Sequence, residues 1–101
     1  MMDKIIGKII FNENGLVPTI AQQYDNKEVL MMAWMNEESI KKTVATGMVH
    51  YWSRSRNKLW MKGETSGNFQ KLKEFHFDCD GDTILLFVDQ SGPACHTGSN
   101  N

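Results

Sequence analysis

The residues best suited to chemistry gather at residues 78–82 and, thirteen residues later, at Cys95 and His96. Residues 78–82 read Asp-Cys-Asp-Gly-Asp, so three carboxylates surround one thiol within five positions. Carboxylate oxygens suit hard cations such as Mg²⁺, whereas thiolate and imidazole suit zinc. The pattern predicts one or two metal sites.

Two simpler explanations of the same stretch are a hairpin turn and an EF-hand. Asp-Gly between two apolar runs is a common hairpin signal, but three aspartates so close together repel one another unless a cation neutralises them. An EF-hand loop needs Gly at its sixth position and Glu at its twelfth. Counted from Asp78, these positions hold Thr83 and Asp89, which excludes the EF-hand.

The alternation of side chains along a strand divides these ligands. If strand pairing extends this far, Asp78 and Asp80 point to one face and Cys79 to the other. We therefore expect adjacent magnesium and zinc sites. An inert buried thiol remains the alternative for Cys79, whereas Cys95 follows a Gly-Pro pair and precedes His96, which is harder to explain as core.

The elements that position these residues fit a single domain, residues 1–101, in which 41% of residues are hydrophobic and can form a core. Apolar runs and turn residues predict strands at 5–11, 16–24, 29–35, 48–53, 59–62, 69–79 and 83–89. The nearly continuous apolar run at 29–35 favours a strand buried on both faces. Asn36 as N-cap and Gly47 as stop predict a short helix between them. The fold class expected is α+β, mostly antiparallel sheet with one or two short helices.

Composition and charge narrow the function. No apolar leader or membrane-length run is present, so we expect a cytoplasmic protein whose two cysteines are thiols or metal ligands rather than a disulfide. The net charge of −1 argues against a general nucleic-acid binder. Residues 50–73 nevertheless carry +5 and the remainder −6, which is either a solvated face or a local phosphate site.

Four stretches together resemble one enzyme family. They are residues 52–56 (Trp-Ser-Arg-Ser-Arg), 59–68 (Leu-Trp-Met-Lys-Gly-Glu-Thr-Ser-Gly-Asn), 78–82 and 92–98 (Gly-Pro-Ala-Cys-His-Thr-Gly). In this order they look like phosphoribosyl-AMP cyclohydrolase. The resemblance runs from about Gly15 to the C-terminus and leaves residues 1–14 as a lead-in outside it.

The resemblance implies hydrolytic opening of the adenine ring of phosphoribosyl-AMP between N1 and C6, the third step of histidine biosynthesis. It also implies an interlocked homodimer with a shared zinc site and a magnesium site. Cys79 and Cys95 match zinc ligands, His96 matches a catalytic base, and the magnesium site matches Asp78, Asp80 and Asp82. A further zinc cysteine of the family falls at position 102, so we expect the chain to continue beyond Asn101; His96 or a partner subunit completing the site is the alternative.

The substrate carries two phosphates, which basic and hydroxyl side chains bind. The residues expected to bind it are Arg54, Arg56, Lys62, Thr65 and Ser66, with Trp52 or Trp60 stacking on the purine or else packing in the core. Zinc lowers the pKa of bound water to roughly 7, and we expect His96 to move the proton as this water attacks C6.

Three other classes remain as rivals. A structural zinc module needs four closed ligands and leaves the carboxylates unexplained. A single-strand nucleic-acid binder, suggested by the aromatic and basic residues of 52–60, conflicts with the acidic remainder. An adenosine-type deaminase differs in releasing ammonia.

Overall fold

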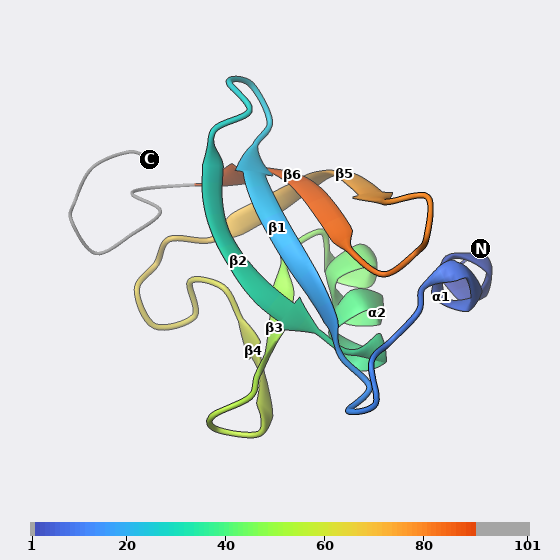
Figure 1. Ribbon diagram of the computed structural model, residues 1–101. Helices are drawn as coiled ribbons and strands as arrows, with labels where there is room; N and C mark the ends of the chain where they lie inside the picture. The colour runs from blue at the N-terminus through green and yellow to red at the C-terminus, as the bar shows by residue number, and fades with distance from the viewer. Residues whose placement is uncertain (1, 91–101) are drawn as a thin grey trace.

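The computed structural model describes residues 2–90, with side chains from Lys4 onward. Figure 1 shows the order of its elements: α1 (Met2–Lys8), β1 (Val17–Gln23), β2 (Val29–Met35), α2 (Glu37–Thr46), β3 (His50–Ser53), β4 (Lys58–Met61), β5 (Gln70–Phe77) and β6 (Ile84–Gln90). The predicted α+β class is confirmed. Neither of the two helices in this part of the chain has the length and apolar character needed to cross a membrane.

The six strands form one sheet in the order β4-β3-β2-β1-β6-β5. Its neighbours pair antiparallel except β1 and β6, which run parallel with Thr19 opposite Ile84. The sheet is therefore mixed, and the prediction of a mostly antiparallel sheet is wrong at its centre. Turn residues in the sequence indicate which consecutive strands pair as antiparallel hairpins. No such local signal indicates whether β6, which is distant in sequence, pairs with β1 in the parallel or the antiparallel direction.

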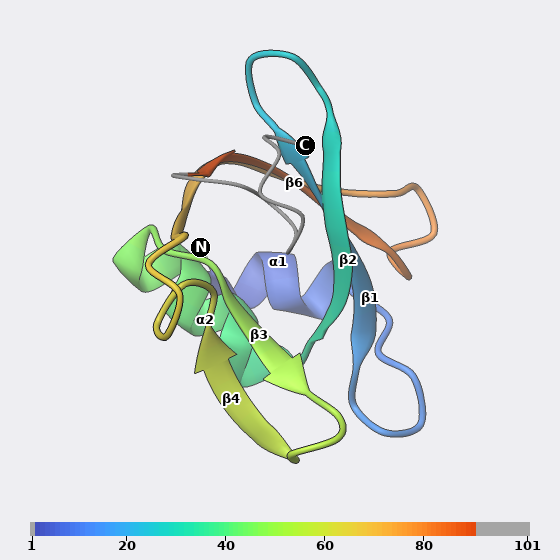
Figure 2. The ribbon, with the colours of Figure 1, turned by 90° about the vertical axis from the view of Figure 1, so that its left-hand side faces the viewer.

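The sheet curls (Figure 2), and its β5 edge meets the segment just before β3. The Val49 N–H donates to the Gln70 carbonyl at 2.9 Å, and the Leu72 N–H donates to the Gly47 carbonyl at 2.8 Å. These bonds join the start of β5 to the chain just before β3. The start of β5 therefore lies beside the segment that leads into the β3–β4 hairpin. The end of β5 lies away from this hairpin, next to the start of β6.

The core fills the inside of this curl. Its buried apolar side chains include Val17, Met35, Ile40, Val49, Tyr51, Ile84, Leu86 and Val88. The Tyr51 hydroxyl donates to the Gln70 side-chain oxygen at 2.7 Å, and burial raises the pKa of Tyr51, so the phenol stays neutral. The buried polar pair thus links β3 to β5 across the core.

Helix α2 begins and ends as the sequence predicts. The Asn36 side chain accepts the Ser39 N–H at 2.9 Å, and the Ser39 hydroxyl accepts the Asn36 N–H at 2.8 Å, which forms a capping box. Gly47 ends the helix with φ 77°, a conformation that glycine adopts without strain. The Thr43 hydroxyl accepts the His50 N–H at 2.8 Å and so fastens α2 to β3.

Two predictions about individual elements are wrong. Residues 5–11, expected as a strand, form the second half of α1 and an irregular segment in which Ile9 is buried. A short apolar run fits either structure, and the packing of Ile5, Ile6 and Ile9 on the core selects the helix. Strand β2, expected to be buried on both faces, leaves Val29 58% and Met32 55% exposed because the described residues place nothing over its outer face.

Candidate functional site

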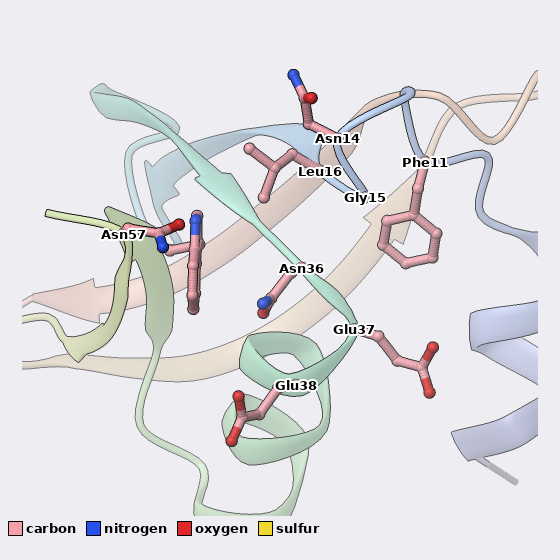
Figure 3. Close-up of a pocket in the computed structure, with 9 residues that line it drawn as sticks. Phe11, Asn14, Gly15, Leu16, Asn36, Glu37, Glu38 and Asn57 are labelled. Atoms are coloured by element: carbon pink, nitrogen blue, oxygen red, sulfur yellow. The ribbon is translucent and has the colours of Figure 1, made fainter. Parts of the chain in front are cut away.

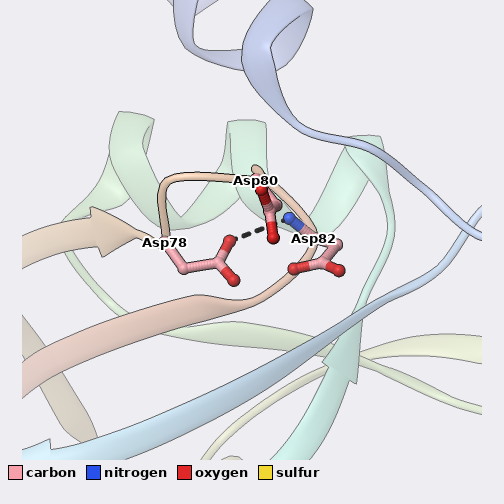
Figure 4. Close-up of side chains that lie close together, drawn as sticks. All are labelled: Asp78, Asp80 and Asp82. Carbon is pink, nitrogen blue, oxygen red and sulfur yellow. Dashed lines mark hydrogen bonds between the residues drawn. The ribbon is translucent and has the colours of Figure 1, made fainter.

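The acidic loop, residues 78–83 between β5 and β6, carries the three predicted magnesium ligands. Asp78, Asp80 and Asp82 are exposed, and one oxygen of each lies within 4.8 Å of the others (Figure 4). Strand pairing stops at Phe77 opposite Ile84. The condition for separating Asp78 and Asp80 from Cys79 by strand alternation is therefore not met, and the loop itself brings the carboxylates together.

Hydrogen bonds within the acidic loop hold its shape. The Asp82 N–H donates to Asp78 Oδ1 at 3.0 Å, and the Gly81 N–H donates to the Asp78 carbonyl at 3.0 Å. The hydrogen bond with the Asp82 side chain lowers the pKa of Asp78. The same bond, together with repulsion from the Asp78 charge, raises the pKa of Asp82. Asp78 is thus the stronger acid of this pair.

The segment that follows α1 fixes the loop from outside. The Ile10 N–H donates to the Gly81 carbonyl at 2.7 Å. Gly81 is buried, has φ +74°, and a Cβ there would collide with the Lys8 carbonyl oxygen. The sequence identified Gly81 only as a hairpin residue and left residues 1–14 outside the family resemblance; no local signal links the two.

The donor set fits the two expected metals in part. Three exposed carboxylates at this spacing suit Mg²⁺, which keeps several waters. Cys79 is free and exposed, which excludes the alternative of a buried inert thiol and leaves a sulfur donor of the kind that suits zinc. Its predicted companions Cys95 and His96 lie outside the described residues.

A basic pocket of about 200 Å³ brings together four of the predicted substrate-binding residues. Its lining residues are Arg56, Trp60, Met61, Lys62, Gly63, Glu64, Thr65 and Ser66. Gly63 has φ +95°, and a Cβ there would lie 2.6 Å from the Phe69 nitrogen, so this loop requires glycine. The Trp60 ring packs on buried Tyr51 with 5.3 Å between centroids, which supports a core role for Trp60.

Trp52 and Arg54, also predicted to bind substrate, line a different region. Two adjoining pockets of about 380 and 320 Å³ share Asn14, Leu16, Trp52 and Asn57, and we call them together the Trp52 groove. Figure 3 shows the first of the two. The second pocket is also lined by Arg54. The first is also lined by Phe11, Gly15, Asn36, Glu37 and Glu38, none of which the sequence motifs had singled out.

Strand register places the Trp52 groove at the same end of the sheet as the acidic loop. Trp52 pairs with Trp34 and Trp34 with Pro18, while Thr19 lies opposite Ile84. Neighbouring strands lie about 4.8 Å apart, so the three steps from β3 to β6 cover roughly 14 Å. Trp52 therefore lies at the same end of the sheet as the acidic loop, three strand steps away from it.

The basic pocket lies elsewhere. Its loop leads into the start of β5, whereas the acidic loop follows the end of this strand. The eight residues of β5 span roughly 25 Å at about 3.3 Å each. One chain therefore does not bring the basic pocket and the acidic loop into contact.

Comparison with known proteins gives one consistent result. A profile of phosphoribosyl-AMP cyclohydrolase matches residues 31–101. The phosphoribosyl-AMP cyclohydrolase of Acidiphilium cryptum is 61% identical over 101 residues, covering 100% of this chain and 87% of that protein. The protein of the same name from Paramagnetospirillum magneticum is 68% identical over 94 residues, 93% of this chain and 71% of the relative. A histidine biosynthesis bifunctional protein of Prochlorococcus marinus is 59% identical over 102 residues, which are 45% of its length.

Proposed function

Because the chain belongs to the phosphoribosyl-AMP cyclohydrolase family, we propose that it opens the adenine ring of phosphoribosyl-AMP by hydrolysis between N1 and C6. The observation that carries the proposal is the match over residues 31–101, which include both the acidic loop and the basic pocket. The reaction belongs to histidine biosynthesis, and its product is the ring-opened carboxamide ribonucleotide.

The chain's own residues supply the metal donors in this proposal. Asp78, Asp80 and Asp82 hold magnesium, an assignment supported by the convergence of their oxygens within 4.8 Å. Cys79 contributes a thiolate to zinc, together with Cys95, and His96 holds or moves the proton of the attacking water. Zinc, when bound, makes that water a nucleophile at neutral pH by lowering its pKa.

The basic pocket binds one of the two phosphates. Arg56 and Lys62 supply positive charge, and Thr65 and Ser66 supply hydroxyl donors to a doubly charged group. The exocyclic amine of adenine stays on the product, because the bond that breaks is N1–C6.

The working form in this proposal is a homodimer. The length of β5 separates the basic pocket from the acidic loop in one chain, and a second copy supplies the missing half of each site. The exposed apolar side chains Val29 and Met32 on β2 are compatible with a surface that a partner covers.

Product analysis tests the reaction. The protein as isolated, incubated with phosphoribosyl-AMP, should yield the ring-opened carboxamide without ammonia. Cys79→Ser should lose zinc and lower turnover by at least roughly a thousandfold. Release of ammonia indicates a deaminase instead, and full turnover by a zinc-free Cys79→Ser protein contradicts the zinc assignment.

Complementation tests the shared site. Cys79→Ser and the double variant Arg56→Met/Lys62→Met should each be nearly inactive. Refolded together, half of the dimers are mixed and each mixed dimer has one intact site, so about a quarter of wild-type activity should return. No recovery in a mixture proven to contain mixed dimers shows that each site lies within one chain.

A further inference from the structure

The Trp52 groove carries opposite charges at its two ends. Glu37 and Glu38 line only the first pocket and Arg54 lines only the second, whereas Trp52 lines both. An aromatic side chain therefore lies between a carboxylate end and a guanidinium end. Pockets of about 380 and 320 Å³ fall at the lower end of the roughly 300–1,000 Å³ usual for small-molecule sites.

The charge at each end remains available to a ligand. Glu37 pairs with Lys41 at 2.9 Å, but within residues 4–90 no ion pair involves Glu38 or Arg54. Asn36 fixes the first turn of α2 through its capping box and so fixes the backbone that carries Glu38. In the view of Figure 3, Glu38 lies on the same side of Asn36 as Asn57, and Glu37 on the side of Phe11.

Arg54 is held in place without losing its charge. Its guanidinium lies over the Trp34 ring, 4.6 Å from the centroid. Such stacking restrains the side chain and leaves its N–H donors free for an anion. Arg56, only two residues away, lines the basic pocket instead, so the two arginines serve different sites.

The substrate of the proposed function matches this arrangement. Attachment of a ribosyl group to N1 gives the adenine ring a delocalised positive charge, and the ribose on N9 carries a 5′-phosphate. A cationic flat ring is attracted both by the face of an aromatic side chain and by a carboxylate. A phosphate is bound well by a guanidinium.

We propose that the Trp52 groove binds the AMP half of the substrate, with the cationic adenine ring between Trp52 and Glu38 and its phosphate at Arg54. This inference rests on the proposed function and adds an orientation. The adenine ring lies at the end of the sheet that carries Cys79 and the acidic loop, and the second phosphate lies in the basic pocket of the second copy. Glu38 is then a specificity residue, which favours N1-substituted adenine over the neutral ring of ordinary adenine nucleotides.

Two stable probes test the groove separately from catalysis. The probes are AMP and 1-methyl-AMP, which differ only in the methyl group and positive charge at N1 and both lack the second ribose phosphate. Calorimetry at neutral pH should show that the wild-type protein binds 1-methyl-AMP about fivefold more tightly than AMP. Glu38→Gln should remove this preference, whereas Glu28→Gln, a matched change near the β1–β2 turn, should keep it.

The other end of the groove has its own expected result. Arg54→Met should weaken both probes equally, by about tenfold, because both carry the same phosphate. Equal wild-type affinity for the two probes, no binding of either at millimolar concentration, or an unchanged preference in Glu38→Gln overturns the inference. If the protein still turns over phosphoribosyl-AMP in that case, the proposed function holds and only the binding role of the groove is wrong. If the preference for 1-methyl-AMP is found but phosphoribosyl-AMP is not turned over, the groove binds as inferred and the proposed function is wrong. Thermal melting confirms that the variants are folded, as expected for exposed side chains.

Discussion

The acidic loop and the basic pocket differ in how their residues come together. The carboxylates of the acidic loop lie within five consecutive positions, and hydrogen bonds inside the loop hold them. The basic pocket combines a hairpin-turn arginine with a strand end and the following loop. The cluster that is contiguous in sequence is also close in space. The basic residues of the β3–β4 hairpin and of the loop after it instead line separate pockets.

Arg54 and Arg56 show this division most directly. Both were predicted to bind phosphate, and both lie in the turn between β3 and β4. The chain reverses there, with Asn57 at φ 53°, and the two side chains line different pockets. Two residues at positions i and i+2 lie on the same face only where the chain is extended.

The largest effect should come from disturbing the support of the acidic loop. Gly81→Ala places a Cβ against the Lys8 carbonyl at a positive φ, and we expect a loss of roughly 3 kcal/mol in the free energy of unfolding. Denaturant titration measures it. Gly7→Ala is the control, because a Cβ at Gly7 meets nothing within 4 Å; equal stability of the two variants removes the proposed role of the α1 segment.

The next effect concerns the proposed metal ligands. Asp80→Asn removes one of three converging oxygens and should weaken Mn²⁺, used as a probe for Mg²⁺, by about thirtyfold. Electron paramagnetic resonance of free Mn²⁺ gives the dissociation constant. Asp25→Asn, a change at an exposed aspartate in the β1–β2 turn, should leave it unchanged, and equal loss in both variants indicates only a general charge effect.

A smaller change should separate the two regions. Lys62→Met should raise KM for phosphoribosyl-AMP about tenfold and leave Mn²⁺ affinity as it was, because the basic pocket and the acidic loop are far apart. Lys58→Met, at the start of β4 and outside the pocket, should change neither. A weakened Mn²⁺ site in Lys62→Met contradicts the separation.

The smallest effect tests one hydrogen bond. Ile10→Pro removes the N–H that binds the Gly81 carbonyl and should weaken Mn²⁺ by about threefold. Ile10→Ala keeps the N–H and removes a side chain that is 60% exposed, so its Mn²⁺ affinity should match the wild type. The same affinity in both variants shows that the loop holds its shape without this contact.

Much of the local structure followed from the sequence. The capping of α2 by Asn36, its end at Gly47 and the six strands expected from residue 16 onward depend on backbone preferences and patterns within a few residues, and the structure confirms them. The closeness of the three aspartates was predictable for the same reason. The family was predictable from motifs in a fixed order, and the comparisons confirm it. The assignments of metals, His96 and the phosphate-binding residues stay predictions.

Only the tertiary structure decided how distant segments meet. The parallel pairing of β1 with β6 and the contacts of Lys8 and Ile10 with Gly81 join parts of the chain some 70 residues apart. The packing of α1 on the core likewise selects a helix there. Such contacts depend on which apolar faces pack together, and the local conformational preferences of the residues do not determine this. By itself the sequence determined the cluster of carboxylates in the acidic loop. Tertiary packing determined which segment supports the acidic loop. It also placed Trp52 and Glu38 at the end of the sheet that carries this loop.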